Sequence, residues 1–457
     1  MRKRFITFGI ALCSIILLNA CQLMPEWMGK DENAPMPGNR ISVLSYQHQW
    51  AADTALAHTK VALPASQYTD NWPLQHTTIS VHPSLSGNLS SVKTYDVGDA
   101  SEDGRYLTSA PLIVGTTLYV LDGEGRITAR DRAKPSEMLW SYQIDAGTSE
   151  DDFLGYDIGS TRKQFLGGNL GYGDGLLVIT TRRGRVIALD SASGTSRWTR
   201  KESLPIISPA VIGDGYVYFV RADNTLIAAG IGDGATSWTH SGFEEETGVM
   251  GAPAPVLRAG RIVVTYSSGE IHVLNAHTGV PLWSTTLTRS GSGFSRPALN
   301  DITATPVVYD GMVYASAVEG MFTALDFTTG AVRWQRDIPS ANTPWVAGGY
   351  IFILTSDNTL LCLERASGSI RWVHSLSNYE EGSGLRDKGD RIIWSGPVLA
   401  GNTLLVAGSD GSLTQISPFT GQAMGNTRIP EGVTLPPVVA GGNVYLISND
   451  ATLAIVN

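Results

Sequence analysis

The side chains that could do chemistry are dispersed along the chain and form no recognisable catalytic motif. The carboxylate runs Asp151-Asp152 and Glu244-Glu245-Glu246 could attract a cation, but they are also typical of solvated surfaces. Two histidine pairs, His76/His82 and His272/His277, have no other ligands placed beside them, so surface histidines are favoured over metal ligands. No nucleotide-binding glycine loop, nucleophile elbow, zinc-protease helix, calcium loop or haem-attachment site occurs. The sequence therefore predicts no catalytic residue and no metal ligand.

Two of the cysteines have predictable roles, one in attaching lipid behind a signal peptide and one in the core. Residues 1–20 have a basic start, Arg2-Lys3-Arg4, and then an apolar run too short to span a membrane, which is typical of a secretory signal peptide. The ending Leu18-Asn19-Ala20-Cys21 resembles a bacterial lipobox and predicts cleavage before Cys21 and lipid attachment there. An ordinary secreted cysteine is the alternative. Cys362, inside an apolar run, is expected to be a buried free thiol.

The charge balance excludes one class of partner. The formal net charge is −9, and removal of the three basic leader residues gives −9 − 3 = −12 for the mature chain. Phosphate backbones would be repelled by this excess, so no nucleic-acid partner is expected. Gln22, rather than aspartate, follows Cys21, and the lipobox resemblance therefore favours the outer membrane, with the protein facing the periplasm.

A repeat organises most of the chain. In residues 309–338, two runs rich in β-formers are joined by a turn, and a second turn at Gly330 leads into a third run that carries Trp334. A turn residue stands four positions before the glycine, and the tryptophan stands four positions after it, which fits a tight turn with a left-handed glycine. Proline-marked segments such as Thr305–Val308 precede most copies and are interpreted as innermost strands. The tryptophans interpreted as structural are Trp140, Trp198, Trp238, Trp283, Trp334 and Trp372.

Repeats of this kind predict an all-β fold, an eight-bladed β-propeller of four-stranded antiparallel blades, over residues 71–457. The last copy stops at Asn457 after three strands. An N-terminal strand in residues 92–98, with Tyr95 in the tryptophan's place, is therefore expected to complete that blade and close the ring. Residues 21–70 lack the repeat and are expected to form the lipidated N-terminus and a tether.

The pattern of Ala324–Trp334 is Ala-Leu-Asp, two residues, threonine or serine, glycine, three residues and tryptophan, and Ala188–Trp198 repeats it. It resembles the pyrroloquinoline-quinone-type propeller repeat. Together with the lipobox and the tether, it makes the chain similar to the BamB family of outer-membrane-protein assembly factors, lipoproteins of the β-barrel assembly machinery. The resemblance implies a scaffold that is not an enzyme, has no cofactor, and helps insertion of outer-membrane β-barrel proteins by binding the barrel subunit BamA alongside other machinery components.

Two alternatives remain open. A quinone-dependent periplasmic dehydrogenase would share the repeat, but that family is longer and typically uses an adjacent-cysteine disulfide and a calcium-bound quinone, whereas this chain has one core cysteine. An unrelated lipid-anchored propeller of the cell envelope is the other alternative.

The resemblance also implies a partner-binding loop. Residues 298–307 look like the BamB loop that precedes an inner strand and contacts BamA through acidic side chains. Asn300 and Asp301 are the candidate partner-binding residues, and Thr303 stands where the family often has a second acid. We expect Asp301 to be an exposed loop charge; the alternative is that it caps a turn before Pro306.

Overall fold

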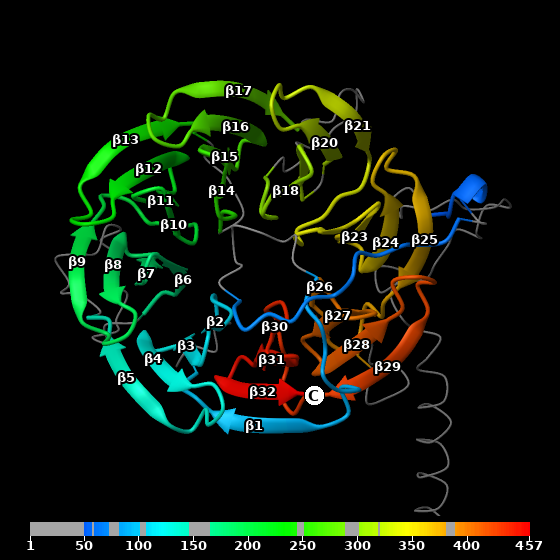
Figure 1. The fold of residues 1–457 in the computed structure, drawn as a ribbon, viewed down its shortest axis with the longest axis horizontal. Coiled ribbons are helices and arrows are strands. Elements are labelled where there is room, and N and C mark those ends of the chain that lie inside the picture. Colours follow the sequence, from blue (N-terminus) through cyan, green and yellow to red (C-terminus); the bar gives the residue numbers. More distant parts are fainter. Residues whose placement is uncertain are drawn as a thin grey trace, which may run out of the picture. The chain divides into compact units, whose positions relative to one another are not determined.

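The computed structural model describes residues 50–56, 59–72, 82–100, 107–145, 165–244, 251–287, 301–318, 320–380 and 389–457. It confirms the predicted fold: eight four-stranded antiparallel sheets form the blades of a ring (Figure 1). Consecutive strands pair within each blade, so the chain passes from the centre of the ring to its rim and then enters the next blade. A short 3-10 helix, η3 (Thr54–Leu56), precedes the first strand.

The strands of the first four blades are as follows. Blade I contains β2 (Leu112–Val114), β3 (Thr117–Leu121), β4 (Arg126–Asp131) and β5 (Met138–Gln143). Blade II contains β6 (Gly168–Gly173), β7 (Leu176–Thr181), β8 (Arg185–Asp190) and β9 (Ser196–Lys201). Blade III contains β10 (Val211–Gly213), β11 (Tyr216–Val220), β12 (Thr225–Gly230) and β13 (Thr236–Ser241). Blade IV contains β14 (Val256–Arg258), β15 (Arg261–Thr265), β16 (Glu270–Asn275) and β17 (Pro281–Thr286).

The remaining blades follow the same plan. Blade V contains β18 (Val307–Tyr309), β19 (Met312–Ser316), β20 (Phe322–Asp326) and β21 (Val332–Arg336). Blade VI contains β22 (Trp345–Ala347), β23 (Tyr350–Leu354), β24 (Thr359–Glu364) and β25 (Ile370–Ser375). Blade VII contains β26 (Trp394–Ala400), β27 (Thr403–Gly408), β28 (Ser412–Ile416) and β29 (Ala423–Arg428). Blade VIII contains β30 (Val438–Ala440), β31 (Asn443–Ile447), β32 (Thr452–Val456) and β1 (Val92–Asp96).

Burial follows the position of a strand in its blade. The second and third strands, such as β23 and β24, are almost entirely buried and apolar, because neighbouring blades cover both of their faces. Outer strands such as β17 alternate between exposed and partly buried positions, because one face lies at the rim. Cys362 lies in β24 as a buried free thiol, as predicted.

The turn between the third and fourth strands has the geometry that the repeat predicted. In blade V the backbone N–H of Gly330 donates to the carbonyl of Asp326 at 2.8 Å. The Asp326 carboxylate accepts the backbone N–H groups of Thr328 and Thr329, both at 3.0 Å. Gly330 has φ +74°, a left-handed conformation that glycine adopts without steric cost. A bulge after Ala324 then places Trp334 opposite Ala324.

The N-terminal strand closes the ring as predicted. β1 pairs antiparallel with β32, and Val92 lies opposite Val456. The expectation that Tyr95 takes the tryptophan's place is wrong. In blade V the tryptophan lies opposite Ala324, two residues before Asp326. The equivalent residue in blade VIII is Ile455, two residues before Asn457, and the residue opposite it is Lys93, not Tyr95. The register differs because this pair of strands has no bulge.

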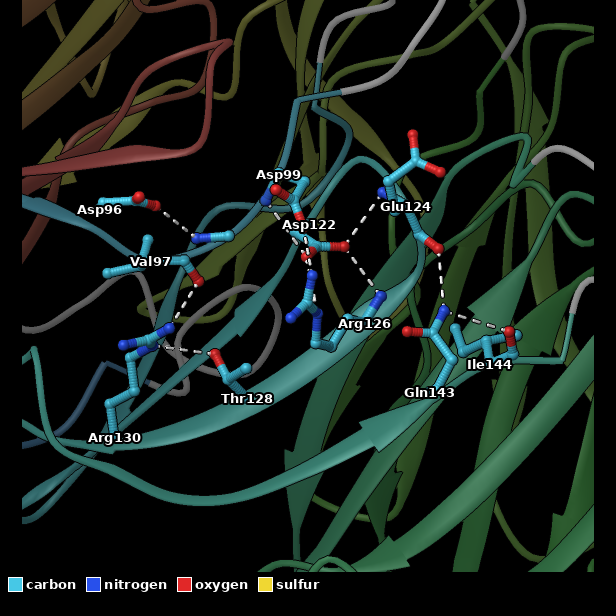
Figure 2. A network of polar contacts seen from close by, with 11 residues as sticks. Asp96, Val97, Asp99, Asp122, Glu124, Arg126, Thr128, Arg130, Gln143 and Ile144 are labelled. Atoms are coloured by element: carbon cyan, nitrogen blue, oxygen red, sulfur yellow. Dashed lines mark hydrogen bonds and ion pairs between the residues drawn. The ribbon is translucent and has the colours of Figure 1, made fainter.

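A polar network fastens the residues after β1 to blade I (Figure 2). Arg130 donates to the carbonyl of Val97 at 3.0 Å, and the buried carboxylate of Asp122 accepts the backbone N–H of Asp99 at 3.3 Å. Arg126 pairs with both Asp99 and Asp122. Burial raises the pKa of Asp122, while hydrogen bonds from the backbone oppose that shift. The network therefore joins blade VIII, which contains β1, to its neighbour in the ring.

The two ends of the ring differ. Because strands alternate in direction, the turns after the first and third strands lie at one end, which we call the hairpin end. The turns after the second strands and the connections between blades lie at the other, the connection end. Residues 59–72 and 82–86, which we call the strap, cross part of the hairpin end. There Gly401, Gly441 and Gly115 donate backbone N–H groups to Pro83 O, Thr69 O and Asn71 Oδ1, each at 2.7 Å.

The strap bears on the expected tether. The tether was expected to span residues 21–70, but part of residues 50–70 contacts the blades. Arg371 Nη2 donates to Thr59 O at 2.7 Å, and Val61 is buried. The signal peptide and the rest of the expected tether, residues 1–49, lie outside the described residues. In the described part of the chain, no helix has the length and apolar character needed to cross a membrane.

Candidate functional site

The residues expected to carry function divide between described and undescribed parts of the chain. Cys21 and Asn300 lie outside the described residues. Asp301 is described, and it is 2% exposed, so the expectation of an exposed loop charge is wrong. It lies next to fully buried Ile302, and its carbonyl accepts the N–H of Val318 at 2.9 Å. Partner binding by Asp301 stays a prediction, and this burial favours the alternative, a structural role in the segment leading to β18.

The six repeat tryptophans connect each of blades I to VI to the blade that follows it. Each indole N–H donates to a backbone carbonyl in the third-to-fourth-strand turn of the following blade, at 2.9–3.1 Å. Each ring also covers the glycine of that turn, where a Cβ atom would lie 2.5–2.7 Å from the ring. The tryptophan–glycine pairs are Trp140–Gly194, Trp198–Gly234, Trp238–Gly279, Trp283–Gly330, Trp334–Gly368 and Trp372–Gly421.

Of the paired histidines, His82 and His272 are less exposed than the sequence suggested, whereas His277 is exposed as expected and His76 lies outside the described residues. His82 is 6% exposed, and its ring nitrogens contact the carbonyl oxygens of Pro64 and Gly401, so the expectation of a surface histidine is wrong there. His272 is also largely buried; it contacts Glu270 at 3.2 Å and lies beside the ring of His240. Burial lowers the pKa of His240. Within the described ranges, no three or more His, Cys, Asp or Glu side chains are grouped to hold a metal.

The ring encloses a central cavity of about 470 Å³. Its wall consists largely of the segments that lead into the first strands of the blades, which are marked by proline and small residues. Apolar members of the wall include Ile207, Pro209, Ala254, Val398, Pro437 and Val438. Polar members are Thr108, Asn169, Arg182, Thr303, Thr305, Asn342, Thr343 and Ser395. The cavity is thus mainly apolar with a limited polar set, which is the usual character of a small-ligand site.

Trp72 of the strap contributes an aromatic wall to this cavity. It is 7% exposed and stacks on Trp345, with ring centroids 6.1 Å apart and an interplanar angle of 18°. Its backbone N–H donates to Ile113 in β2 at 2.7 Å. The predicted propeller began at residue 71, but no sequence pattern indicated that Trp72 would line the central cavity. An isolated tryptophan in a proline-rich segment was the available signal.

The cavity does not fit a calcium-bound quinone. Calcium sites in proteins usually include Asp or Glu carboxylates, and no Asp or Glu is among the described residues that line the cavity. Cys362 is the free cysteine of the described chain and lies inside β24, so it supplies no adjacent-cysteine disulfide to this wall. The side chains present therefore do not support the dehydrogenase alternative.

Comparisons with known proteins agree with the repeat and the fold. Residues 149–374 match a family model described as outer membrane protein assembly factor BamB. BamB of Yersinia pestis is 25% identical over 378 residues, which cover 82% of this chain and 91% of that protein.

Solved structures share the propeller. A crystal structure of BamB from Moraxella catarrhalis matches with a TM-score of 0.62 and 21% identity, covering 80% of this chain and 100% of the other. A europium-containing methanol dehydrogenase matches with the same TM-score of 0.62 at 14% identity, covering 82% of this chain and 89% of the other. These structural matches show the fold alone, whereas the family model and the Yersinia pestis relative are both described as BamB. The chain is therefore similar, in sequence and in fold, to the outer membrane protein assembly factors named BamB.

Proposed function

We propose that the protein is a non-enzymatic scaffold of the outer-membrane β-barrel assembly machinery and binds a BamA-like barrel subunit. In this proposal, lipid on Cys21 anchors it in the outer membrane, facing the periplasm, and residues between Cys21 and the strap form the tether. One observation supports the proposal: the similarity to BamB extends over 82% of this chain and 91% of the relative, which is far longer than a single shared repeat. The described residues of the cavity wall include no Asp or Glu, which speaks against the calcium-bound quinone of the dehydrogenase alternative.

The connection end is the better place for the partner. The strap occupies part of the hairpin end through hydrogen bonds to blades VII, VIII and I, so a partner docking there would have to displace it. The longest connections, after β5, β17 and β25, all leave the ring at the opposite end. Loops on a rigid scaffold tolerate variation and commonly carry binding residues. A barrel subunit that contacts these connections leaves the strap and the ring closure undisturbed.

Co-purification from detergent-solubilised outer membranes tests the proposal. The wild-type chain should capture the barrel subunit. Cys21→Ser should melt at the same temperature but leave the membrane fraction, because the anchor and the ring are separate modules. Absence of any barrel subunit in the captured material would refute the scaffold role. Dye-linked alcohol oxidation after addition of quinone and calcium would refute the non-enzymatic part.

A further inference from the structure

The polar groups of the central cavity are not all used by the fold. Thr108 exchanges hydrogen bonds with Gly168, Ser395 donates to Thr434 O, and Thr343 accepts the N–H of Thr305. By contrast, the hydroxyl of Thr303 is buried and has no hydrogen-bond partner among the described residues. A buried hydroxyl without a partner costs free energy, so its presence in a cavity wall indicates a group that a bound molecule or water satisfies.

Two side-chain amides extend this set. Asn169 and Asn342 line the cavity, are only partly exposed, and make no side-chain hydrogen bond to the described residues. Each amide offers two donors and an acceptor, so the pair and the Thr303 hydroxyl can orient a polar ligand. Asn169 starts blade II and Asn342 precedes blade VI, so they approach the cavity from separate parts of the ring.

Charge and aromatic surface are arranged at opposite ends of the cavity. Arg182, in the turn after β7, lies at the connection end and is the one charged residue among the described residues of the wall. Trp72 comes from the strap, at the hairpin end, and stacks on Trp345. A ligand that entered from the connection end would meet the two tryptophans with its inner part and Arg182 with its outer part. The guanidinium favours a carboxylate or sulfonate at that outer position.

We propose that the central cavity binds a small organic anion with a flat aromatic body, the aromatic part against Trp72 and Trp345 and the anionic group toward Arg182. The volume of about 470 Å³ lies within the range of small-molecule sites. The described wall has no carboxylate that would repel the anion, and none that would hold a metal, so the binding requires no metal ion. This site is independent of the proposed scaffold role.

Two fluorescent probes that differ only in charge test the proposal. They are 8-anilinonaphthalene-1-sulfonate and its uncharged counterpart N-phenyl-1-naphthylamine, titrated into the full mature chain with and without EDTA. We expect one saturable site for the sulfonate, unaffected by EDTA. Arg182→Gln should weaken sulfonate binding about tenfold and leave the uncharged probe unchanged, whereas Arg182→Lys should restore most of the sulfonate affinity. The matched control is Arg258→Gln, an exposed arginine at the end of β14, which should bind both probes like the wild type.

Two further variants test whether the probes bind in the central cavity. Thr303→Val keeps the side-chain shape and should weaken the sulfonate a few fold, and Trp72→Ala should weaken both probes. Circular dichroism melting identifies any variant that does not fold. If Arg182→Gln or Trp72→Ala fails to fold, the binding data of Arg182→Lys and Thr303→Val decide whether the proposal holds. Absence of saturable binding, equal loss in Arg182→Gln and Arg258→Gln, or unchanged binding of both probes by Trp72→Ala would overturn the proposal.

Discussion

Replacing the turn glycine of blade V tests how much the tryptophan contacts between blades contribute to stability. Gly330 has φ +74°, and a Cβ atom there would lie 2.7 Å from Cδ2 and Cε3 of Trp283 in blade IV. Gly311, in the first turn of the same blade, has nearly the same φ, +73°, but a Cβ atom there would meet no atom within 4 Å. Gly311→Ala is therefore a control for backbone strain alone.

The magnitudes separate the two variants. An alanine held in the left-handed region costs about 1–2 kcal/mol, and both variants incur that cost. Gly330→Ala must also displace the Trp283 ring, which breaks the bond from its indole N–H to Phe327 O (3.0 Å). Losing a hydrogen bond of this kind costs about 1 kcal/mol, before any loss of ring packing. We therefore expect Gly311→Ala to lose about 1–2 kcal/mol of unfolding free energy, and Gly330→Ala about 1–2 kcal/mol more.

Urea denaturation, followed by circular dichroism and by tryptophan emission, measures the difference. The native-state emission of Gly330→Ala should shift to longer wavelength, because a partly buried indole is moved towards water, while that of Gly311→Ala should match the wild type. Equal destabilisation by the two substitutions, with unchanged emission in both, would show that the glycine serves the turn alone and that the tryptophan contact is incidental.

Three further predictions concern ring closure, Asp301 and the turn carboxylate. Deleting β1 (Val92–Asp96) should lower the melting temperature of the whole ring, because β32 would be left as an exposed edge strand; an unchanged melting curve would contradict closure by β1. Asp301→Arg should destabilise the fold more than Asp301→Asn, because the site is 2% exposed and a buried arginine needs both space and a partner; equal melting of both variants would contradict this. Hydrogen bonds, chiefly from Arg333 and secondly from Thr329, lower the pKa of Asp326 from 3.8 to about 2. The contribution of this carboxylate to folding stability is therefore complete above pH 3.8 and is lost as the pH falls through 2. The stability difference between wild type and Asp326→Asn, measured by urea denaturation, should accordingly shrink from pH 4 to pH 2.

The fold could be predicted because its signals are local. The turn of Asp326 and Gly330 is closed by bonds between residues four or fewer positions apart, and such a turn leaves glycine and tryptophan at the same spacing in blades II to VI. The tryptophan spacing is also local, although the contact that it makes lies in the next blade. The register of β1 against β32 was not predictable in the same way. The outer strands that carry tryptophan have a bulge next to it, whereas β1 and β32 pair without one.

The burial of Asp301 and the strap are tertiary facts without a local signal. A polar residue among Asn, Thr and Pro predicts an exposed loop, whereas Asp301 is buried beside fully buried Ile302, a result of tertiary packing. The strap holds the ring mainly through backbone groups, as in the bond from Gly441 N to Thr69 O, and backbone groups carry no residue-type pattern. The aromatic wall of the cavity includes Trp72 of the strap, so it could not be predicted from the sequence either.

One pattern in the first hairpin turns does follow the strap. The first turn residue has positive φ in all eight blades, whatever its type: Gly115, Asp174, Asp214, Ala259, Asp310, Gly348, Gly401 and Gly441. The four glycines belong to blades I, VI, VII and VIII, which are the blades that the strap contacts, and the other four turns carry aspartate or alanine. The turn itself therefore does not require glycine. At Gly348 a Cβ atom would lie 3.3 Å from Pro64 Cδ, closer than packed atoms normally approach, so glycine there serves the strap. At Gly115 a Cβ atom would meet nothing within 4 Å, so this steric reason holds at Gly348 and does not explain the whole run of four glycines.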